Sequence, residues 1–325
     1  MGKLARPLVV VSKCIEFEPV RWNAQMISSD LVRKLEPHAK FIPVCPEVEI
    51  GLGVPRETLR IVSRNGELRL AQPATGFDFT DKMESFVDRF LVSLDEIDGF
   101  IFKSGSPTCA FKDAKVYSNA RQLVPISRIP GFFGRAVLAK FPDLAIEDER
   151  RLSNFRIREH FLTKLYALAS FREAKNSHSM NEVVKFHSNN KLLLTAYSQR
   201  ELTVLGRVIA DQKNRPPEEI VRTYQKHLFK ALKHPPPRGS NINVMTKVMG
   251  YFSERVSKQE KAFFLASVEK YKAGRLPSSA VRDVLKAWTV RFGEDYLMEQ
   301  TFLKPYLEEL MDTEATAGHR GEKNY

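Results

Sequence analysis

The chain has 325 residues, of which 43% are hydrophobic and 28% are charged, and its formal net charge is +12. This composition is typical of a soluble globular protein, and the length is sufficient for two domains with separate cores. No apolar run reaches the roughly 18 residues that a membrane-spanning helix needs, which excludes a membrane-spanning protein, and we expect a cytoplasmic one.

The positive charge is concentrated in one half of the chain. Residues 1–148 contain 20 Lys and Arg against 19 Asp and Glu, whereas residues 149–325 contain 31 against 20. The two parts therefore have net charges of +1 and +11. A basic module joined to a nearly neutral one is typical of nucleic-acid-binding proteins, because phosphate neutralisation supplies most sequence-independent affinity. Many mildly basic domains lack this role, so charge alone leaves both interpretations open.

The first half alternates short apolar strands with amphipathic helices. Strand patterns cover 8–12, 40–44 and 99–103, and helical patterns cover 24–38 and 80–94, the latter with Thr80 as the expected N-cap. Between the apolar segments 59–63 and 67–71, the pair Asn65-Gly66 predicts a hairpin with a tight turn. We therefore expect an α/β domain with a mainly parallel sheet over residues 1–145.

From about residue 146 the pattern changes to long amphipathic helices. Their predicted ranges are 147–174, 181–198, 200–213, 216–234, 242–253, 257–273, 277–292 and a last one that ends near residue 311. A stiff proline-rich connector is predicted over 235–241. We expect an all-α domain over 146–312, followed by a disordered tail over 313–325.

The three cysteines of the chain each follow a predicted buried strand. They are Cys14, Cys45 and Cys109, all within the first 110 residues. Because parallel strands end at one common edge, where α/β proteins bind ligands, three thiols that are distant in sequence can converge there. Three thiolates around one centre suit an iron–sulfur cluster or a metal with an open position.

The alternative is that these thiols are chemically inert. Free cysteines are often buried as small hydrophobic residues, and scattered cysteines without a CxxC pair favour this interpretation. The surrounding loops favour the binding of a cluster or metal. They are polar or rich in Gly and Pro, as binding loops are, and read SKCIEFEP, CPEVEIGLGVPR and SGSPTC. The odd number of cysteines argues against a disulfide framework.

The helical half carries a continuous basic stripe. Arg222, Lys226, Lys230 and Lys233 follow helical spacing, with few acidic residues among them. Such a stripe is often only the solvated face of a surface helix, but its continuity favours contact with phosphates. Tyrosine and histidine side chains are interleaved with the basic residues of these helices, and they are either base-stacking groups or half-buried core residues. They are Tyr197, His187, Tyr224 and His227.

At the cysteine loops the sequence resembles a known family. The segments VVVSKCIEFEPVRWNAQ, CPEVEIGLGVPR and FKSGSPTC are similar to the three signatures of the DUF523 or TudS family, the thiouracil desulfurases. In the second half, EDERRL, FHSNNKLLL and NINVMTKVMGYF resemble the DUF1722 (YbgA-like) domain. The fused arrangement resembles the RudS family of bacterial desulfidases, which act on 4-thiouridine in tRNA.

The resemblance implies a cofactor and a set of site residues. The cofactor is a four-iron four-sulfur (4Fe-4S) cluster held through three irons by Cys14, Cys45 and Cys109, with the fourth iron open to the sulfur of a thiocarbonyl. The catalytic groups implied are Glu47, in the CPE motif, and Ser106, the first serine of SPTC.

The sequence departs from the family pattern at several positions. Trp22-Asn23-Ala24 stands where members commonly have Tyr-Asn-Gly or Tyr-Asp-Gly, and Ala110 stands in place of the usual Gly after the third cysteine. In the helical half, Thr246-Lys247 replaces the more usual Gln-His. The three cysteines are intact, so these departures concern the fit of the substrate.

The residue types also indicate a mechanism. A thione carbon becomes a good electrophile when its sulfur is drawn onto a soft Lewis acid such as iron. A carboxylate can then activate water, and Glu47 is the first candidate for this base, with Glu49 as its rival. Ser106 is either a hydrogen-bond donor to the substrate or a turn-forming residue before proline. Other polar residues expected at the same crevice are Arg56, Lys103 and Ser104.

These observations lead to one prediction and two alternatives. We expect a hydrolytic, non-redox desulfidase that converts 4-thiouridine in tRNA to uridine and releases sulfide, with tRNA held by the basic helical domain. The alternatives are an enzyme that acts on free thiouracil or thionucleosides, and a cluster-bearing nucleic-acid-binding sensor without catalysis. We expect a monomer, and a substrate base that is flipped out of its stack.

Overall fold

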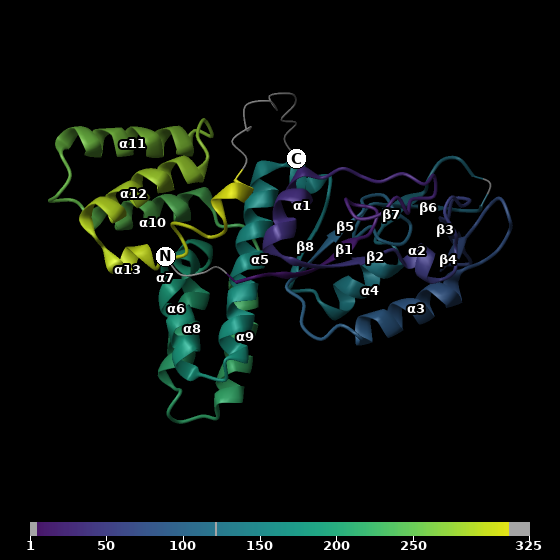
Figure 1. The fold of residues 1–325 in the computed structure, drawn as a ribbon, viewed down its shortest axis with the longest axis horizontal. Coiled ribbons are helices and arrows are strands. Elements are labelled where there is room, and N and C mark those ends of the chain that lie inside the picture. Colours follow the sequence, from purple (N-terminus) through teal and green to yellow (C-terminus); the bar gives the residue numbers. More distant parts are fainter. Residues whose placement is uncertain (1–4, 121, 312–325) are drawn as a thin grey trace. The chain divides into compact units, whose positions relative to one another are not determined.

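The computed structural model describes residues 5–120 and 122–311 (Figure 1). It divides the chain into two compact units. The α/β unit contains Arg6–Ala169 and residues 309–311, and the helical unit contains Ser170–Glu308. The division falls inside the long helix α5 (Phe155–Asn176). The tail predicted over 313–325 lies outside the described residues.

Four parallel strands form the first sheet of the α/β unit. In spatial order they are β2 (Lys40–Val44), β1 (Leu8–Ser12), β5 (Gly99–Phe102) and β8 (Ala145–Asp148). The strand β1 lies between β2 and β5, and its residues Val9, Val10 and Val11 are completely buried, as is typical of a parallel strand covered on both faces. The predicted fold class, an α/β region with a mainly parallel sheet followed by a helix-rich region, is confirmed.

The strand β8 corrects one predicted element. The sequence pattern predicts that a long helix starts at Glu147, but Glu147 and Asp148 belong to β8, which pairs in parallel with β5. The helix α5 begins only at Phe155. A strand of four residues is too short for a recognisable alternation of apolar and polar residues, so the helical pattern that follows masked it.

A second sheet has the strand order β4-β3-β6-β7. Its strands are β3 (Arg60–Arg64), β4 (Glu67–Ala71), β6 (Ala114–Tyr117) and β7 (Ser127–Ile129). The predicted hairpin is confirmed, since β3 and β4 are antiparallel and Asn65 and Gly66 have the positive φ angles of a tight turn, 51° and 86°. The pattern does not predict β6 and β7, because each is only three or four residues long.

The helix predicted over 24–38 is much shorter in the structure. Helix α1 covers only Asp30–Leu35, and its N-cap Ser29 accepts a hydrogen bond from the Val32 amide. The preceding residues pair in parallel with the first cysteine loop through a bridge between Ile15 and Ile27, and the Ile27 amide donates to the carbonyl of Cys14 over 2.7 Å. The prediction of one helix over 24–38 was therefore wrong. The apolar residues in this range belong partly to a short helix and partly to a segment that is hydrogen-bonded to the Cys14 loop.

Helices α3 (Thr80–Val92) and α4 (Phe132–Lys140) share one hydrophobic core with both sheets. The helix predicted over 80–94 is confirmed as α3, and four of the five residues of its apolar face are buried and the fifth is half-buried. These residues are Met83, Phe86, Val87, Leu91 and Phe90. Thr80 is not the N-cap but the first helical residue, and its hydroxyl binds Asp78 and the Leu70 amide.

The helical unit contains the end of α5 and eight further helices among the described residues. They are α6 (Met180–Asn189), α7 (Lys191–Tyr197), α8 (Gln199–Ala210), α9 (Pro217–Ala231), α10 (Arg238–Gly250), α11 (Lys258–Lys272), α12 (Ser278–Phe292) and α13 (Asp295–Met298). The helix predicted over 181–198 is divided at Asn190, whose side chain bonds to the Phe186 carbonyl. The connector predicted over 235–241 ends earlier, because α10 begins at Arg238. No helix among the described residues is both long and apolar enough to cross a membrane.

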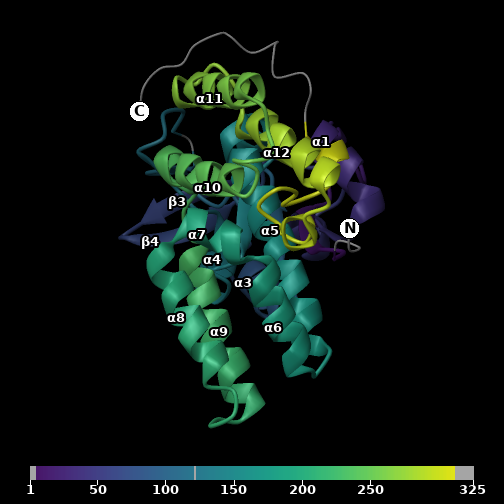
Figure 2. The same ribbon diagram turned by 90° about the vertical axis from the view of Figure 1, so that its left-hand side faces the viewer.

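Helices α8 and α9 lie side by side as an antiparallel pair (Figures 1 and 2). The aromatic core of this region is built around Tyr224, which is completely buried and stacks on Phe171 with 5.3 Å between ring centroids. The His187 ring is 3.1 Å from the Tyr224 hydroxyl, and the His227 ring is 2.7 Å from the Glu201 carboxylate. Tyr224 is therefore a core residue and not a base-stacking side chain.

The first turn of α4 holds the loop that carries the third cysteine. Backbone amides of Phe132 and Phe133 donate to the carbonyls of Pro107 and Thr108 over 3.2 and 3.0 Å. Gly134 lies directly against the same loop, since a Cβ atom there would be 2.1 Å from the Ala110 carbonyl oxygen. The close approach of helix and loop therefore requires glycine at this position.

We expect Gly134→Ala to destabilise the α/β unit by about 2 kcal/mol, the usual cost of an overpacked core. The added methyl group would push the Cys109 loop away from α4. The chain has two tryptophans, and Trp22 lies in the α/β unit, so Trp22 fluorescence in a Trp288→Phe background reports unfolding of that unit in denaturant. Gly239→Ala, where no atom lies within 4 Å of the new methyl group, is the matched control. Equal stability of the two variants would contradict the argument.

Candidate active site

The three cysteines lie at one edge of the first sheet. Cys14 comes two residues after β1, Cys45 comes directly after β2, and Cys109 lies on the loop after β5. These strands are parallel neighbours, so their carboxyl ends meet at the same edge. The side chains are 9%, 8% and 6% exposed, and none forms a disulfide.

The three thiols are close enough for their charges to interact. Burial is the main cause that raises the pKa of each thiol, to about 12 for Cys14. A negative charge on Cys45 raises the pKa of both Cys14 and Cys109 further. Soft metal centres bind thiolates and displace these protons, so metal binding here releases protons.

Positive side chains stand beside two of the thiols. Lys103 and Arg21 lower the pKa of Cys14, and Arg56 lowers that of Cys45. Among the residues that the structure describes, no group of His, Cys, Asp and Glu is arranged to hold a single metal ion. The thiols therefore share one buried edge whose charge is partly compensated by these cations.

The short helix α2 (Pro46–Glu49) carries both candidate bases and places their side chains in different environments. Pro46 occupies the first helical position, which suits its fixed φ angle, and Cys45 is the N-cap. Glu47 faces inward and is 12% exposed, whereas the Glu49 side chain is exposed and forms no hydrogen bond or ion pair with any described residue. The geometry favours Glu47 over Glu49.

Glu47 forms a buried ion pair with Arg56. The Arg56 Nε and Nη2 atoms lie 2.8 and 2.7 Å from Glu47 Oε2, and the Arg56 side chain is only 6% exposed. Arg56 Nη1 also donates to the Val20 carbonyl over 3.0 Å, and the Arg56 amide donates to the Trp22 carbonyl. Arg56 therefore joins helix α2, which carries Glu47, to the loop of the first cysteine.

The other carboxylate oxygen of Glu47 is held by Thr108. The Thr108 hydroxyl donates to Glu47 Oε1 over 2.9 Å and lies 3.0 Å from the Ser106 hydroxyl. Ser106 Oγ in turn accepts from the amides of Thr108 and Cys109. Ser106 thus organises the turn of its own loop and is connected to Glu47 through the Thr108 hydroxyl.

Sequence reasoning did not identify Thr108 or Glu149. Thr108 precedes Cys109 directly, and a hydroxyl next to a ligand position was the available signal. Glu149 binds the Lys103 ammonium over 2.6 Å and the Ser104 hydroxyl and amide over 2.8 Å, and its side chain is 7% exposed. Its negative charge raises the pKa of Cys14, so this cluster borders the first thiol.

We expect Arg56→Met to destabilise the α/β unit by about 3 kcal/mol, because it leaves the buried Glu47 carboxylate without its ionic partner. Adding Glu47→Gln should restore much of that loss, since the buried negative charge is removed. Denaturant unfolding followed by Trp22 fluorescence measures both effects. Arg69→Met is the control, because the Arg69–Glu67 pair is exposed and solvent screens the attraction between its charges. Additive effects of the two changes would contradict coupling within the pair.

Two family models match different parts of the chain. The model described as 2-thiouracil desulfurase matches residues 9–149, which include all three cysteines, Glu47 and Ser106. The model described as protein of unknown function (DUF1722) matches residues 191–306. The two matches lie mainly in the α/β unit and in the helical unit respectively.

Two relatives and one solved structure are similar to parts of the chain. The uncharacterized protein YbgA of Escherichia coli (strain K12) is 24% identical over 152 residues, which cover 46% of this chain and 89% of YbgA. The uncharacterized protein YbbK of Bacillus subtilis (strain 168) is 30% identical over 109 residues, which cover 31% of this chain and 72% of YbbK. A structure of the 4Fe-4S-dependent thiouracil desulfidase TudS is 25% identical, with a TM-score of 0.37, over 46% of this chain and 94% of that one.

The family assignment follows from the similarity to YbbK and from the two family models. The similarity to YbbK covers most of that relative, and the desulfurase model spans the α/β unit from β1 to β8. The chain belongs to the DUF523-type 2-thiouracil desulfurase family through residues 9–149, and it carries a DUF1722 (YbgA-like) domain after them.

Proposed function

We propose that the chain is an iron–sulfur-dependent desulfidase that hydrolyses 4-thiouridine in tRNA to uridine and sulfide. The observation that carries the proposal is the position of Glu47. This carboxylate follows Cys45 by two residues, is bonded to the residue before Cys109, and is held at both oxygens. A fixed carboxylate beside three convergent thiols is the arrangement that water-dependent removal of sulfur needs.

The thiols of Cys14, Cys45 and Cys109 would hold a 4Fe-4S cluster. The donor set fits, since three soft ligands share one buried edge and positive charges stand beside Cys14 and Cys45. Cysteine thiolates are the usual protein ligands of such a cluster. When bound, the cluster supplies a soft Lewis acid for the thiocarbonyl sulfur.

The chain's own residues would handle water and protons. Glu47 takes a proton from the water whose oxygen forms the new bond to the base carbon, while the carbon–sulfur bond breaks. The sulfur leaves as hydrogen sulfide, which carries away both protons of the water, and the water oxygen becomes the carbonyl oxygen, so no electrons are gained or lost. Arg56 and Thr108 fix the plane of the Glu47 carboxylate, and Ser106 positions Thr108.

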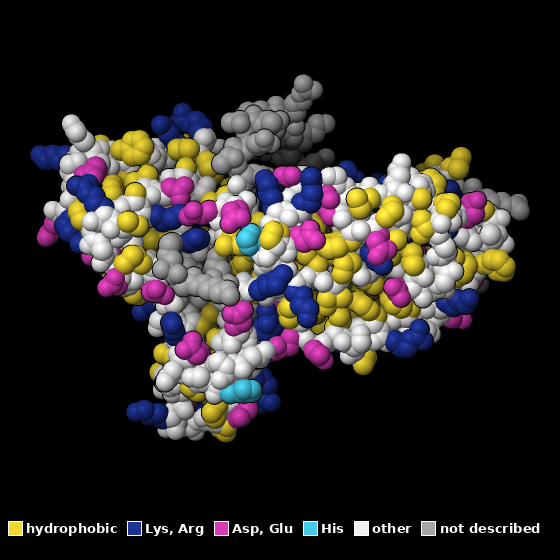
Figure 3. Space-filling view, viewed as in Figure 1, with side chains coloured by type: hydrophobic (Ala, Val, Ile, Leu, Met, Phe, Trp, Pro, Cys, Tyr) yellow, Lys and Arg dark blue, Asp and Glu magenta, His cyan; other side chains and the backbone are white. Residues whose placement is uncertain are grey.

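The helical unit supports tRNA as the substrate. Arg222, Lys226 and Lys230 on α9 and Lys233 just after it are exposed, and none pairs with a described acidic residue. Over α11 and α12, by contrast, basic and acidic side chains alternate (Figure 3), and the pairs include Arg291–Glu260 and Lys272–Glu269. The unpaired stripe on α9 is the better surface for phosphates.

We expect Glu47→Gln to keep the cluster and lower the rate of sulfide release at least about 100-fold, the usual contribution of a general base. Glu49→Gln should retain the wild-type rate, because Glu49 is exposed and without partners among the described residues. The measurement is anaerobic reconstitution, determination of bound iron and sulfide, and nucleoside analysis of thiolated tRNA after incubation. Persistence of 4-thiouridine with an intact wild-type cluster would support the sensor alternative and overturn the proposal.

We expect tRNA binding to depend steeply on salt through the stripe on α9. A triple change to Gln at Arg222, Lys226 and Lys230 should reduce the slope of log affinity against log salt by about 2 between about 50 and 200 mM. The control removes the same number of exposed charges from α11, at Lys258, Lys270 and Lys272, and should have a smaller effect. Equal slopes for the wild type and the α9 variant, or wild-type activity on free thionucleosides alone, would favour the free-substrate enzyme.

A further inference from the structure

A buried hydroxyl group lies at the end of β1, close to the thiols. Ser12 is the last residue of this strand, two positions before Cys14, and it is 3% exposed. The amide of Lys103, directly after β5, donates to Ser12 Oγ over 3.0 Å. This bond uses the hydroxyl oxygen as an acceptor and leaves the hydroxyl proton to be donated elsewhere. A buried hydroxyl proton is rarely left without an acceptor.

The sulfur of Cys109 is the acceptor for this proton. Burial is the main cause that raises the pKa of the Cys109 thiol, and a negative charge on Cys45 raises it further, whereas a hydrogen bond with the Ser12 side chain lowers it. A bond that lowers the pKa stabilises the thiolate, so the hydroxyl donates and the sulfur accepts. No oxygen atom of the described residues accepts a hydrogen bond from the Ser12 hydroxyl.

Other donors beside the thiols are directed mainly to Glu47. The Thr108 hydroxyl lies 3.7 Å from Cys109 Sγ, but its single proton has a nearer acceptor in Glu47 Oε1 at 2.9 Å. Arg56 Nη2 lies 3.9 Å from Cys45 Sγ and 2.7 Å from Glu47 Oε2. In both cases the carboxylate is the closer partner. The hydroxyl at the end of β1 has no such competing acceptor within the described part of the chain.

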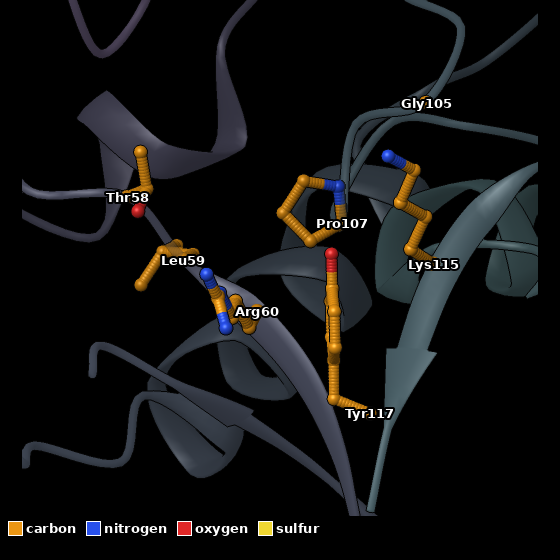
Figure 4. A pocket seen from close by; sticks show the side chains of 7 residues that line it. All are labelled: Thr58, Leu59, Arg60, Gly105, Pro107, Lys115 and Tyr117. Atoms are coloured by element: carbon orange, nitrogen blue, oxygen red, sulfur yellow. The ribbon is translucent and has the colours of Figure 1, made fainter. Parts of the chain in front are cut away.

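Solvent does not compete for this hydroxyl either. A surface pocket lies against the loop that carries Cys109, and its lining includes Gly105 and Pro107 of that loop (Figure 4). Neither Ser12 nor Cys109 lines the pocket, and Cys109 is only 6% exposed. The hydrogen bond between Ser12 and Cys109 is therefore buried, and a hydrogen bond is electrostatically stronger in such surroundings than in water.

The residue that orients the hydroxyl is itself held in place. The Lys103 ammonium lies 2.6 Å from the carboxylate of Glu149, which comes directly after β8. The same carboxylate accepts from the amide and the hydroxyl of Ser104 over 2.8 Å. The end of β5 is thus fixed to the end of β8. This contact keeps the Lys103 amide, and with it the Ser12 hydroxyl, in one position.

We propose that the Ser12 hydroxyl donates a hydrogen bond to the Cys109 thiolate and thereby makes the bound cluster a stronger Lewis acid. The inference rests on the proposed function, which supplies the cluster. A donor beside a ligand sulfur draws negative charge from it, and hydrogen bonds to the sulfurs help to set the reduction potential of iron–sulfur clusters. The same withdrawal of charge favours binding of the thiocarbonyl sulfur. Ser12 is a positioning residue, because it acts through Cys109.

The test measures the one-electron midpoint potential of the cluster in the anaerobically reconstituted full chain, by redox titration followed by electron paramagnetic resonance. In Ser12→Ala the reduced cluster should lose about tenfold in relative stability, which lowers the potential by about 59 mV. The rate of sulfide release should fall about tenfold, as is usual for the loss of a hydrogen bond to a metal ligand. Thr80→Val is the matched control and should change neither value. It removes a buried hydroxyl of the same unit, bonded to Asp78 and the Leu70 amide.

A second pair of variants separates the hydroxyl from the space that it fills. Ser12→Thr and Ser12→Val add the same bulk and differ from each other in the hydroxyl. Ser12→Thr should keep the wild-type potential, and Ser12→Val should show the lowered one. If Ser12→Ala and Ser12→Val lose the cluster while Ser12→Thr keeps it, the hydroxyl is again supported as the required group. Loss of the cluster from all three variants overturns this role of the hydroxyl.

The outcomes separate the two proposals. Equal midpoint potentials in Ser12→Ala and the wild type overturn the assignment of Ser12 and leave the proposed function standing. A wild type that holds its cluster and releases no sulfide overturns the proposed function, whereas a lowered potential in Ser12→Ala still supports the hydrogen bond to Cys109. A wild type that binds no iron overturns both proposals.

Discussion

The parallel pairing of β1 with β2 and β5 is the constraint on which the rest of the site depends. Three neighbouring strands that run in one direction send three loops off one edge, and each of these loops carries one cysteine. Any antiparallel partner in this set would carry its cysteine to the opposite edge. The first turn of α4 then fixes the third loop through backbone amides, and Gly134 permits the close approach.

Two buried ion pairs border the thiols. Arg56–Glu47 lies beside Cys45, and Lys103–Glu149 lies beside Cys14. Each pair brings a positive charge next to groups that must become thiolates to bind a metal, and each cation is itself neutralised by a carboxylate. The Glu47 carboxylate neutralises Arg56 and is also the proposed base. The same side chain therefore affects both the stability of the site and its chemistry.

The helical unit distributes its charge in a different way. Aromatic rings pack around Tyr224 in its interior, while the outer face of α9 carries cations without acidic partners among the described residues. Burial of its aromatic face stabilises α9, so the charges on its outer face are not needed for folding and can attract phosphates over a long range.

The sequence by itself determined the α/β class, the hairpin at Asn65-Gly66, the presence of most long helices and the loops that carry the cysteines, because local periodicity and turn chemistry are encoded in neighbouring residues. Only the tertiary structure decided which residues meet. The pairing of Glu47 with Arg56 and Thr108 joins segments up to 61 residues apart, and no local pattern records it. Strand β8 and the segment before α1 were misread for the same reason, since their conformation is set by pairing with β5 and with the Cys14 loop.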